Sequence, residues 1–181
     1  MKNPSIDFKP LQISDFKLLV KWMNAPHVFK WWNEGEKWTL EDVDTKYRPY
    51  SMGYKILKNV KKPMNSLVIL INDNPIGYIQ YYNKYHFPPA QGYCTKNLPT
   101  SLAAIDLYIG ELEYVSKGYG PKIIEKLISD VIKKDFDHCF VDPENKNYAA
   151  IKAYKKIGFV VKRVAENETL MVRNNGEIGV K

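Results

Sequence analysis

The sequence holds few of the residues from which metal sites and disulfide frameworks are built. Its 181 residues include 2 cysteines, Cys94 and Cys139, and 3 histidines. Because none of them stands at the short spacing of zinc ligands, we expect no metal site. The longest apolar run, Leu67–Ile71, is far shorter than the roughly 20 residues of a membrane helix. Met1–Phe8 shows no secretory pattern, so we expect a cytoplasmic protein with reduced cysteines.

What is present is the composition of a folded, basic protein. Hydrophobic residues make up 45% and aromatic residues 13% of the chain, which excludes an intrinsically disordered protein. The length predicts a single domain over residues 1–181. The formal net charge of +7 fits nucleic acid, acidic lipid or a phosphorylated cofactor as partner, and it does not choose among them.

Two helices are expected early in the chain. Ser14 is predicted to cap the first, and Pro26 is predicted to end it. An aromatic stretch then leads into an acidic loop. Thr39 and Asp42 form a capping box at the start of the second helix, which is predicted to extend to about Tyr47.

The remaining pattern predicts an α+β fold with a mixed sheet. The apolar spacing from Ile123 to Ile132 is typical of an amphipathic helix, and a further helix over 147–156 is closed by Gly158. Turn residues at 72–75 join two strands in a hairpin, and 85–100 is expected to be a long loop. Strands are predicted at 6–11, 66–71, 76–82, 104–109, 138–141, 159–164 and 169–173.

A glycine loop, Val115–Lys122, precedes the amphipathic helix. Gly118 and Gly120 allow backbone N–H groups to approach a ligand, and a helix N-terminus adds positive potential. Lys117 and Lys122 flank the loop and suit a pyrophosphate. The spacing matches neither the dinucleotide-binding pattern nor the P-loop. On spacing alone, a plain helix-start turn and a phosphate site both stay open.

Three motifs resemble the acyl-CoA core of the GNAT superfamily of N-acetyltransferases. They are Lys117-Gly118-Tyr119-Gly120, the stretch Asp142–Asn147, and Ala150–Phe159, which with Asn147 gives Asn-x-x-Ala-Ile-x-x-Tyr-x-x-x-Gly-Phe. Within the superfamily the chain most resembles the aminoglycoside 6'-N-acetyltransferases. With these it also shares Trp31-Trp32, Thr39–Val43, Pro75–Gln80 and Ala104–Asp106, so the resemblance covers roughly residues 6–173.

The resemblance implies a fold and a cofactor. The fold is α+β, with a mixed, mostly antiparallel central sheet, a splayed parallel strand pair and flanking helices. One domain would hold an acetyl-CoA core at about 103–160 and acceptor-side elements at about 22–100. The cofactor is acetyl-CoA, its pantetheine on the strand backbone and its pyrophosphate on the glycine loop. The residues implied in its binding are Leu107, Tyr108, Ile109, Val115, Lys117, Gly118, Tyr119, Gly120, Pro121, Lys122, Asn147 and Lys152.

Acetyl transfer to an amine requires a proton acceptor, an oxyanion donor and a proton donor for the thiolate. Asp106 is the candidate proton acceptor, and the alternative is a carboxylate in a structural hydrogen bond. A backbone N–H near Tyr108 is the candidate oxyanion donor. By resemblance Tyr154 protonates the thiolate, whereas its helical spacing alone is typical of a core aromatic residue.

The acceptor is expected to be a small amine. One candidate is an aminoglycoside-like polyamine, acetylated at its 6'-amine in antibiotic resistance. Because the loop at 85–100 contains Lys96 and no acid, a second candidate stays open, namely another small amine or hydroxylamine such as a polyamine or a siderophore precursor. A nucleic-acid module using Lys55, Lys58, Lys61 and Lys62 is the third alternative. It is not favoured, because this short cluster is more typical of a solvated helix face or a loop and no nucleic-acid fold motif accompanies it. We expect no nucleic acid or membrane partner, and a monomer or homodimer. The residues predicted to contact the acceptor are Trp31, Trp32, Glu34, Glu36, Tyr78, Asp106 and Asp142.

Overall fold

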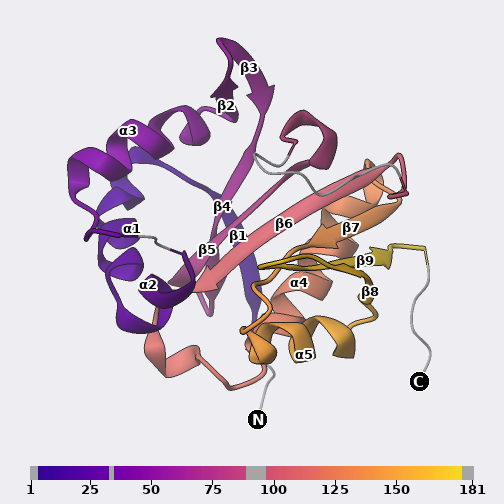
Figure 1. Cartoon of the computed structure of the whole chain (residues 1–181). Helices are drawn as coiled ribbons and strands as arrows, with labels where there is room; N and C mark the ends of the chain where they lie inside the picture. The colour runs from indigo at the N-terminus through magenta and orange to yellow at the C-terminus, as the bar shows by residue number, and fades with distance from the viewer. Residues whose placement is uncertain (1–3, 33–34, 89–96, 177–181) are drawn as a thin grey trace. The chain divides into compact units, whose positions relative to one another are not determined.

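The computed structural model describes residues 4–32, 35–88 and 97–176 (Figure 1). The chain forms two compact units. Unit 1 consists of Met1–Tyr81 and Asp106–Tyr119, and unit 2 of Tyr82–Ile105 and Gly120–Lys181. Within the described residues, no helix has both the length and the apolar character that a membrane crossing requires.

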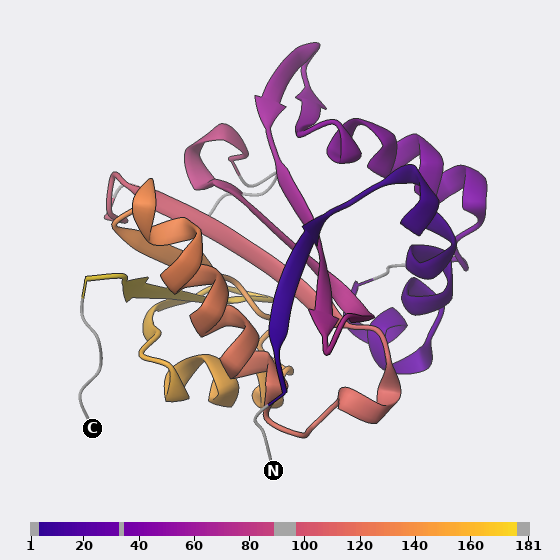
Figure 2. The ribbon, with the colours of Figure 1, turned by 180° about the vertical axis from the view of Figure 1, so that it is seen from behind.

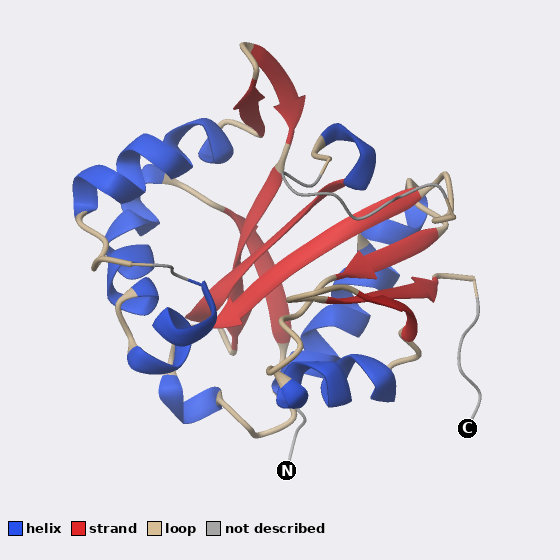
Figure 3. Cartoon of the chain, viewed as in Figure 1, coloured by secondary structure: helices blue, strands red, loops and turns tan. Residues whose placement is uncertain are grey.

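Unit 1 combines antiparallel strands with three α-helices (Figure 3). Its strand order is β1-β4-β5-β6, with β6 contributing only its C-terminal part. Strands β1 and β5 both pair antiparallel with β4. The elements are β1 (Ile6–Pro10), η1 (Ile13–Asp15), α1 (Phe16–Met23), α2 (Pro26–Trp32), α3 (Leu40–Ser51), β2 (Tyr54–Leu57), β3 (Val60–Pro63), β4 (Asn65–Ile71), β5 (Asn74–Asn83), β6 (Leu102–Ile109) and η3 (Leu112–Tyr114).

Unit 2 has the strand order β6-β7-β9-β8 and contains the parallel pair. The pairing of β6 with β7 ends at Ala104, although β6 continues to Ile109. Figure 2 shows α4 in front of the strands of this unit. The α+β fold with mostly antiparallel strands and one parallel pair is therefore confirmed. Its elements are η2 (Lys84–His86), α4 (Tyr119–Asp130), η4 (Ile132–Lys134), β7 (His138–Val141), α5 (Tyr148–Lys156), β8 (Val160–Val164) and β9 (Thr169–Asn174).

Some local signals hold and others do not. Thr39 and Asp42 form the predicted capping box, with Asp42 N donating to Thr39 Oγ1 at 3.2 Å and Thr39 N donating to Asp42 Oδ2 at 2.8 Å. The prediction for the start of the first helix was wrong. Ser14 lies inside η1, and the side chain of Asp15, the residue before α1, accepts from Gln12 N at the start of η1 and caps no N–H of α1. Helix α1 ends at Met23, shortly before Pro26, and Pro26 itself opens α2, where the first helical position needs no N–H donor.

The lysine-rich stretch was also interpreted incorrectly. The sequence favoured a helix face or a loop, whereas Tyr54–Leu57 and Val60–Pro63 form an antiparallel hairpin. Lys58 and Asn59 occupy its turn with φ of 48° and 63°. Positive φ angles at two successive residues are typical of the type I′ turns that join paired strands. Because such turns favour asparagine, aspartate and glycine, Lys58 did not indicate one.

A first prediction concerns Gly77 on β5. A Cβ at this position would overlap the backbone carbonyl oxygen of Tyr108, and a strand backbone cannot move away cheaply. We expect Gly77→Ala to lower the free energy of unfolding by about 2–4 kcal/mol in urea titrations. The matched control is Gly120→Ala in α4, where a Cβ would meet no atom within 4 Å. The control should be neutral or slightly stabilising, and equal losses in both variants would contradict the close approach.

Candidate functional site

A chain of hydrogen bonds leads to Asp106 across three strands of unit 1. The Tyr78 hydroxyl lies 2.9 Å from Ser66 Oγ and donates to Gln80 Oε1 at 2.8 Å. Gln80 Nε2 donates to Asp106 Oδ2 at 2.7 Å. Because one end of the Gln80 amide faces a donor and the other a carboxylate, its orientation is determined. The carboxylate of Asp106, half-buried in β6, is held in place by this chain.

Aromatic rings surround the hydrogen-bonded chain. The Tyr108 ring lies 5.6 Å from the Tyr78 ring and 4.8 Å from the Trp32 ring, between centroids. The Tyr47 ring lies 5.5 Å from that of Tyr78, and Trp32 Nε1 donates to the Tyr47 hydroxyl at 3.3 Å. These residues come from α2, α3, β5 and β6, so helices and strands of unit 1 build the same layer of rings. We call Trp32, Tyr47, Tyr78 and Tyr108 the aromatic layer.

The hydroxyls of the aromatic layer are held in their neutral form. Burial raises the pKa of Tyr78 and of Tyr108 well above the ordinary tyrosine value. Burial also raises the pKa of Tyr50, next to this layer, to about 12, and the charge of Asp106 adds to the effect. The Tyr108 hydroxyl is buried and has no hydrogen-bond partner among the residues that the structure describes. These groups are therefore donors at neutral pH and not bases.

Lys46 of α3 is a residue that the sequence did not single out. Its Nζ lies 4.7 Å from the centroid of the Trp38 ring and 5.4 Å from that of Tyr47. Burial of this ammonium among the rings lowers the pKa of Lys46, as does the charge of Lys55, while Asp106 raises it. A cation thus stands close enough to Asp106 for each charge to influence the other.

The glycine loop has the local geometry that an anion needs. Ser116 and Gly118 have φ of 60° and 79°, which turns their neighbouring amides away from the regular pattern. A Cβ at Gly118 or Gly120 would meet no protein atom within 4 Å, so a ligand can approach the backbone. The first turn of α4, which begins at Tyr119, contains no acidic residue. The loop therefore fits a phosphate-bearing group, although Val115 N already donates to Leu112 O.

In unit 2, helix α5 carries two of the predicted residues. Asn147 caps this helix, since its Oδ1 accepts from Ala150 N at 3.2 Å. The helix ends as predicted at Gly158, with Phe159 N donating to Tyr154 O and Gly158 N donating to Lys155 O. The half-buried Tyr154 ring lies 5.5 Å from that of Phe159. The N-terminal cap of α5 is therefore Asn147, a residue that the resemblance implies in cofactor binding.

Two acceptor-side predictions change. Tyr78 has no exposed surface and its hydroxyl donates to Gln80, which argues against the predicted direct contact with an acceptor. Asp142 belongs to unit 2, and its Oδ2 lies 3.4 Å from the Nζ of the buried Lys84. That carboxylate already has an internal cation, which weakens the case for an ammonium of the acceptor.

The other residues predicted to contact the acceptor or the cofactor do not take part in the hydrogen bonds that lead to Asp106. Lys30 Nζ lies 4.5 Å from the centroid of the Trp31 ring, and Glu36 is exposed. Glu34 lies outside the described residues, as does Lys96 of the long loop. The predicted cofactor residues are divided between unit 1 (Leu107, Tyr108, Ile109, Val115, Lys117, Gly118, Tyr119) and unit 2 (Gly120, Pro121, Lys122, Asn147, Lys152).

Sequence reasoning missed His27 and Gln80 as well as Lys46. His27 Nε2 donates to Ile109 O at 3.0 Å, at the end of β6. A lone histidine in an aromatic stretch gives no sign of such a bond. Gln80 lies two residues after Tyr78 on the same strand. That spacing indicates that the two side chains share one face of the strand, but it does not identify Asp106 as their neighbour.

The comparisons with known proteins agree with the motifs. The sequence model of the family described as acetyltransferase (GNAT) domain matches residues 12–166. A structure of AAC(6')-Ib in complex with paromomycin and acetyl-CoA has 23% identity and a TM-score of 0.79, covering 94% of this chain and 93% of that one. An uncharacterised protein from Bacillus halodurans has 21% identity and a TM-score of 0.80, covering 95% of this chain and 85% of that one.

A third similar structure is the aminoglycoside N(6')acetyltransferase of Legionella pneumophila. It has 20% identity and a TM-score of 0.68, covering 97% of this chain and 95% of the other. At these identities the likeness of the structures establishes a common fold.

A second prediction tests the chain of hydrogen bonds. Tyr78→Phe leaves Gln80 Oε1 and Ser66 Oγ without the buried hydroxyl between them. We expect the free energy of unfolding to fall by about 1–3 kcal/mol, measured by urea titration. Tyr148→Phe, at a tyrosine that is 75% exposed, is the control and should change it by less than about 0.5 kcal/mol. A Tyr78 variant as stable as the wild type would show that this hydroxyl contributes nothing to the chain.

Proposed function

The chain belongs to the GNAT acetyltransferases and is an acyltransferase, and from that membership we propose that it moves an acetyl group from acetyl-CoA to the primary amine of a small molecule. The observation that carries the proposal is the half-buried Asp106, held by Gln80 beside the aromatic layer. Such a carboxylate attracts an ammonium group and can accept its proton. The sequence further predicts a cytoplasmic enzyme that is a monomer or homodimer.

Acetyl-CoA, when bound, supplies the acetyl group as an activated thioester. Residues Val115–Lys122 would hold its pyrophosphate, since they combine open backbone amides, a helix start without acids, and the exposed Lys117 and Lys122. Backbone groups of Leu107, Tyr108 and Ile109 would hold the pantetheine arm, and β7 pairing stops before them at Ala104. Asn147 and the exposed Lys152 complete the proposed set.

Asp106 is proposed to accept the proton of the acceptor's ammonium group. The amine must lose this proton before its nitrogen can attack a carbonyl carbon, because the lone pair is otherwise occupied. Gln80 fixes one carboxylate oxygen at 2.7 Å and so orients the group. A backbone N–H near Tyr108 would stabilise the oxygen that gains charge during transfer. The Tyr154 hydroxyl is proposed to donate a proton to the departing sulfur.

The acceptor has two candidate classes. Similar solved structures are complexes with paromomycin, ribostamycin and kanamycin, which favours the 6'-amine of an aminoglycoside-like polyamine and a role in antibiotic resistance. The specific observation that favours a different small amine or hydroxylamine is the cation of Lys46, which interacts electrostatically with Asp106. Trp31, Trp32 and Glu36 would contribute to the acceptor side in either case.

A third prediction tests the reaction and its base. Acetyl-CoA should raise the melting temperature, and thiol release should appear with amines in a panel that includes kanamycin and simple alkylamines. Asp106→Asn should lower kcat/KM at least 100-fold, since the amide keeps the shape but cannot accept the proton. Asp44→Asn, on the surface of α3 and paired with Arg48, is the control and should retain activity. No stabilisation by acetyl-CoA and no thiol release would contradict the proposed function.

A fourth prediction tests the glycine loop. Gly118→Ala forces a side chain onto a backbone with φ of 79°, so the loop should shift and the Kd for coenzyme A should rise about 10-fold. Gly53→Ala is matched to it, with φ of 83° and no atom within 4 Å of a Cβ. Isothermal titration calorimetry should show unchanged affinity in that control. Equal affinity in both variants would argue against the loop as the pyrophosphate site.

A further inference from the structure

We propose that the acceptor carries an anionic group, such as a carboxylate, besides its amine, and that Lys46 binds this anionic group while Asp106 binds the amine. The inference rests on the proposed function and names the substrate class of the same site. All residues that carry it belong to unit 1.

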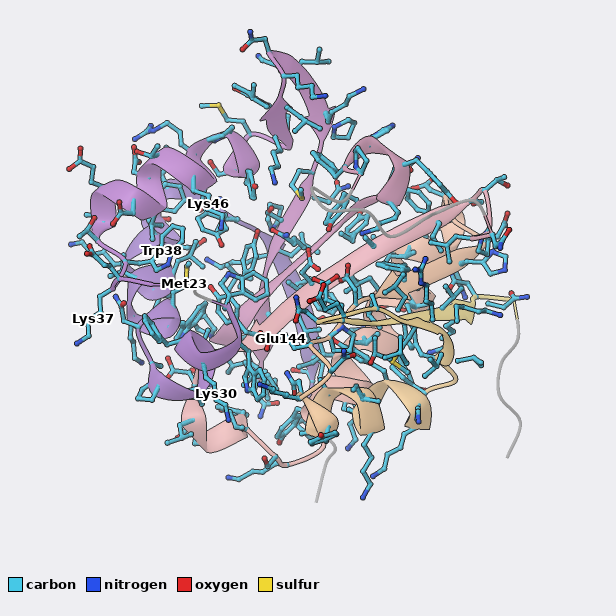
Figure 4. All side chains as sticks on the ribbon, viewed as in Figure 1. Met23, Lys30, Lys37, Trp38, Lys46 and Glu144 are labelled. Carbon is cyan, nitrogen blue, oxygen red and sulfur yellow. The ribbon has the colours of Figure 1, made fainter. Side chains whose placement is uncertain are left out.

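The first step is the placement of Lys46 without an acid beside it. Its Nζ lies over the rings of Trp38 and Tyr47, and Figure 4 labels Lys46 and Trp38 on the helical part of unit 1. Across the part of the chain that the structure describes, no carboxylate comes within ion-pairing distance of this ammonium. Aromatic rings partly replace its water, so an incoming anion would pair with it in a weakly screened environment.

The second step is the short path from Lys46 to Asp106. The Tyr47 ring, below the Lys46 ammonium, packs 5.5 Å from the Tyr78 ring. Tyr78 in turn bonds to Gln80, and Gln80 bonds to Asp106. The opposite effects of Asp106 and Lys55 on the pKa of Lys46 agree with this neighbourhood. An amine at Asp106 and an anion at Lys46 therefore fit one molecule of modest length.

The third step is the sign of the charges around the carboxylate. The ammonium of Lys46 is a cation that the described residues leave without a carboxylate partner. A polycation that brought one ammonium to Asp106 would bring its other ammonium groups toward Lys46. Repulsion between those ammonium groups and Lys46 would oppose binding, whereas an anionic group of the acceptor would be attracted to Lys46.

The unpartnered Tyr108 hydroxyl is an independent sign of a polar ligand. It is buried in the aromatic layer, and Tyr108 as a whole is 7% exposed. A buried hydroxyl without a partner destabilises a protein, and a bound polar group that pairs with it removes this cost. The aromatic layer thus holds one hydrogen-bonding group that the described residues do not satisfy.

A fifth prediction compares three amines of equal length that differ at the far end. 6-Aminohexanoate ends in a carboxylate, hexylamine in a methyl group and 1,6-diaminohexane in an ammonium group. The wild type should prefer 6-aminohexanoate to the diamine at least 10-fold in kcat/KM, measured by thiol release. Lys46→Met should lower the ratio of kcat/KM for 6-aminohexanoate to that for hexylamine about 10-fold, and Lys46→Glu should favour the diamine.

The matched control is Lys61→Met on β3. Lys61 Nζ also lies over a tyrosine ring, 4.4 Å from the centroid of Tyr54, so the same charge and the same type of contact are removed. This variant should keep the wild-type preference, and melting temperatures should show that all variants fold.

The outcomes separate the two proposals. Turnover with a preference for the diamine or kanamycin, or a preference that Lys46→Met leaves unchanged, would overturn the anionic acceptor and leave the acetyltransferase standing. Absence of thiol release with every amine would overturn both.

Discussion

The hydrogen bond from Gln80 to Asp106 is the contact on which the candidate acceptor site depends. It joins the side chains of β5 and β6 at 2.7 Å and fixes the one carboxylate that the proposed reaction uses. Behind it, the Tyr78 hydroxyl orients the Gln80 amide, and the aromatic layer excludes water from that hydroxyl. The proposed base, Asp106, is therefore held by residues that are themselves fixed by packing, which is how a positioned carboxylate keeps its geometry.

The cofactor side follows a different physical rule. The glycine loop offers backbone amides and a helix start, and these need no particular side chain to hold phosphate oxygens. For this reason the apolar side chain of Val115 does not argue against the loop as a phosphate site. Part of the net positive charge belongs to Lys117 and Lys122, which are proposed to face the pyrophosphate, and part to Lys46, which is proposed to bind an anionic group of the acceptor.

Much of the fold could be predicted because its signals are local. Thr39 with Asp42 is a complete capping signal within four residues, and Gly158 closes a helix through its own neighbours. Pro26 could not be assigned in the same way, because a proline marks the start of one helix as readily as the end of another. Lys58 did not indicate a hairpin turn, because lysine is not typical of such turns. The interactions of Lys46 with Asp106 and of Lys84 with Asp142 could not be predicted, since each joins residues that are far apart in the sequence.

From the sequence alone, the residue types and spacing of Val115–Lys122 indicated the glycine loop, and the resemblance of the motifs to the GNAT superfamily indicated the family and Asp106 as the candidate base. The tertiary structure decided what stands around that base. It buried Tyr78 and made it a support, paired Asp142 with Lys84, and placed Lys46 among aromatic rings near Asp106. The net charge at a site depends on residues that folding brings together from distant parts of the sequence. It therefore cannot be predicted from the spacing of residues along the chain.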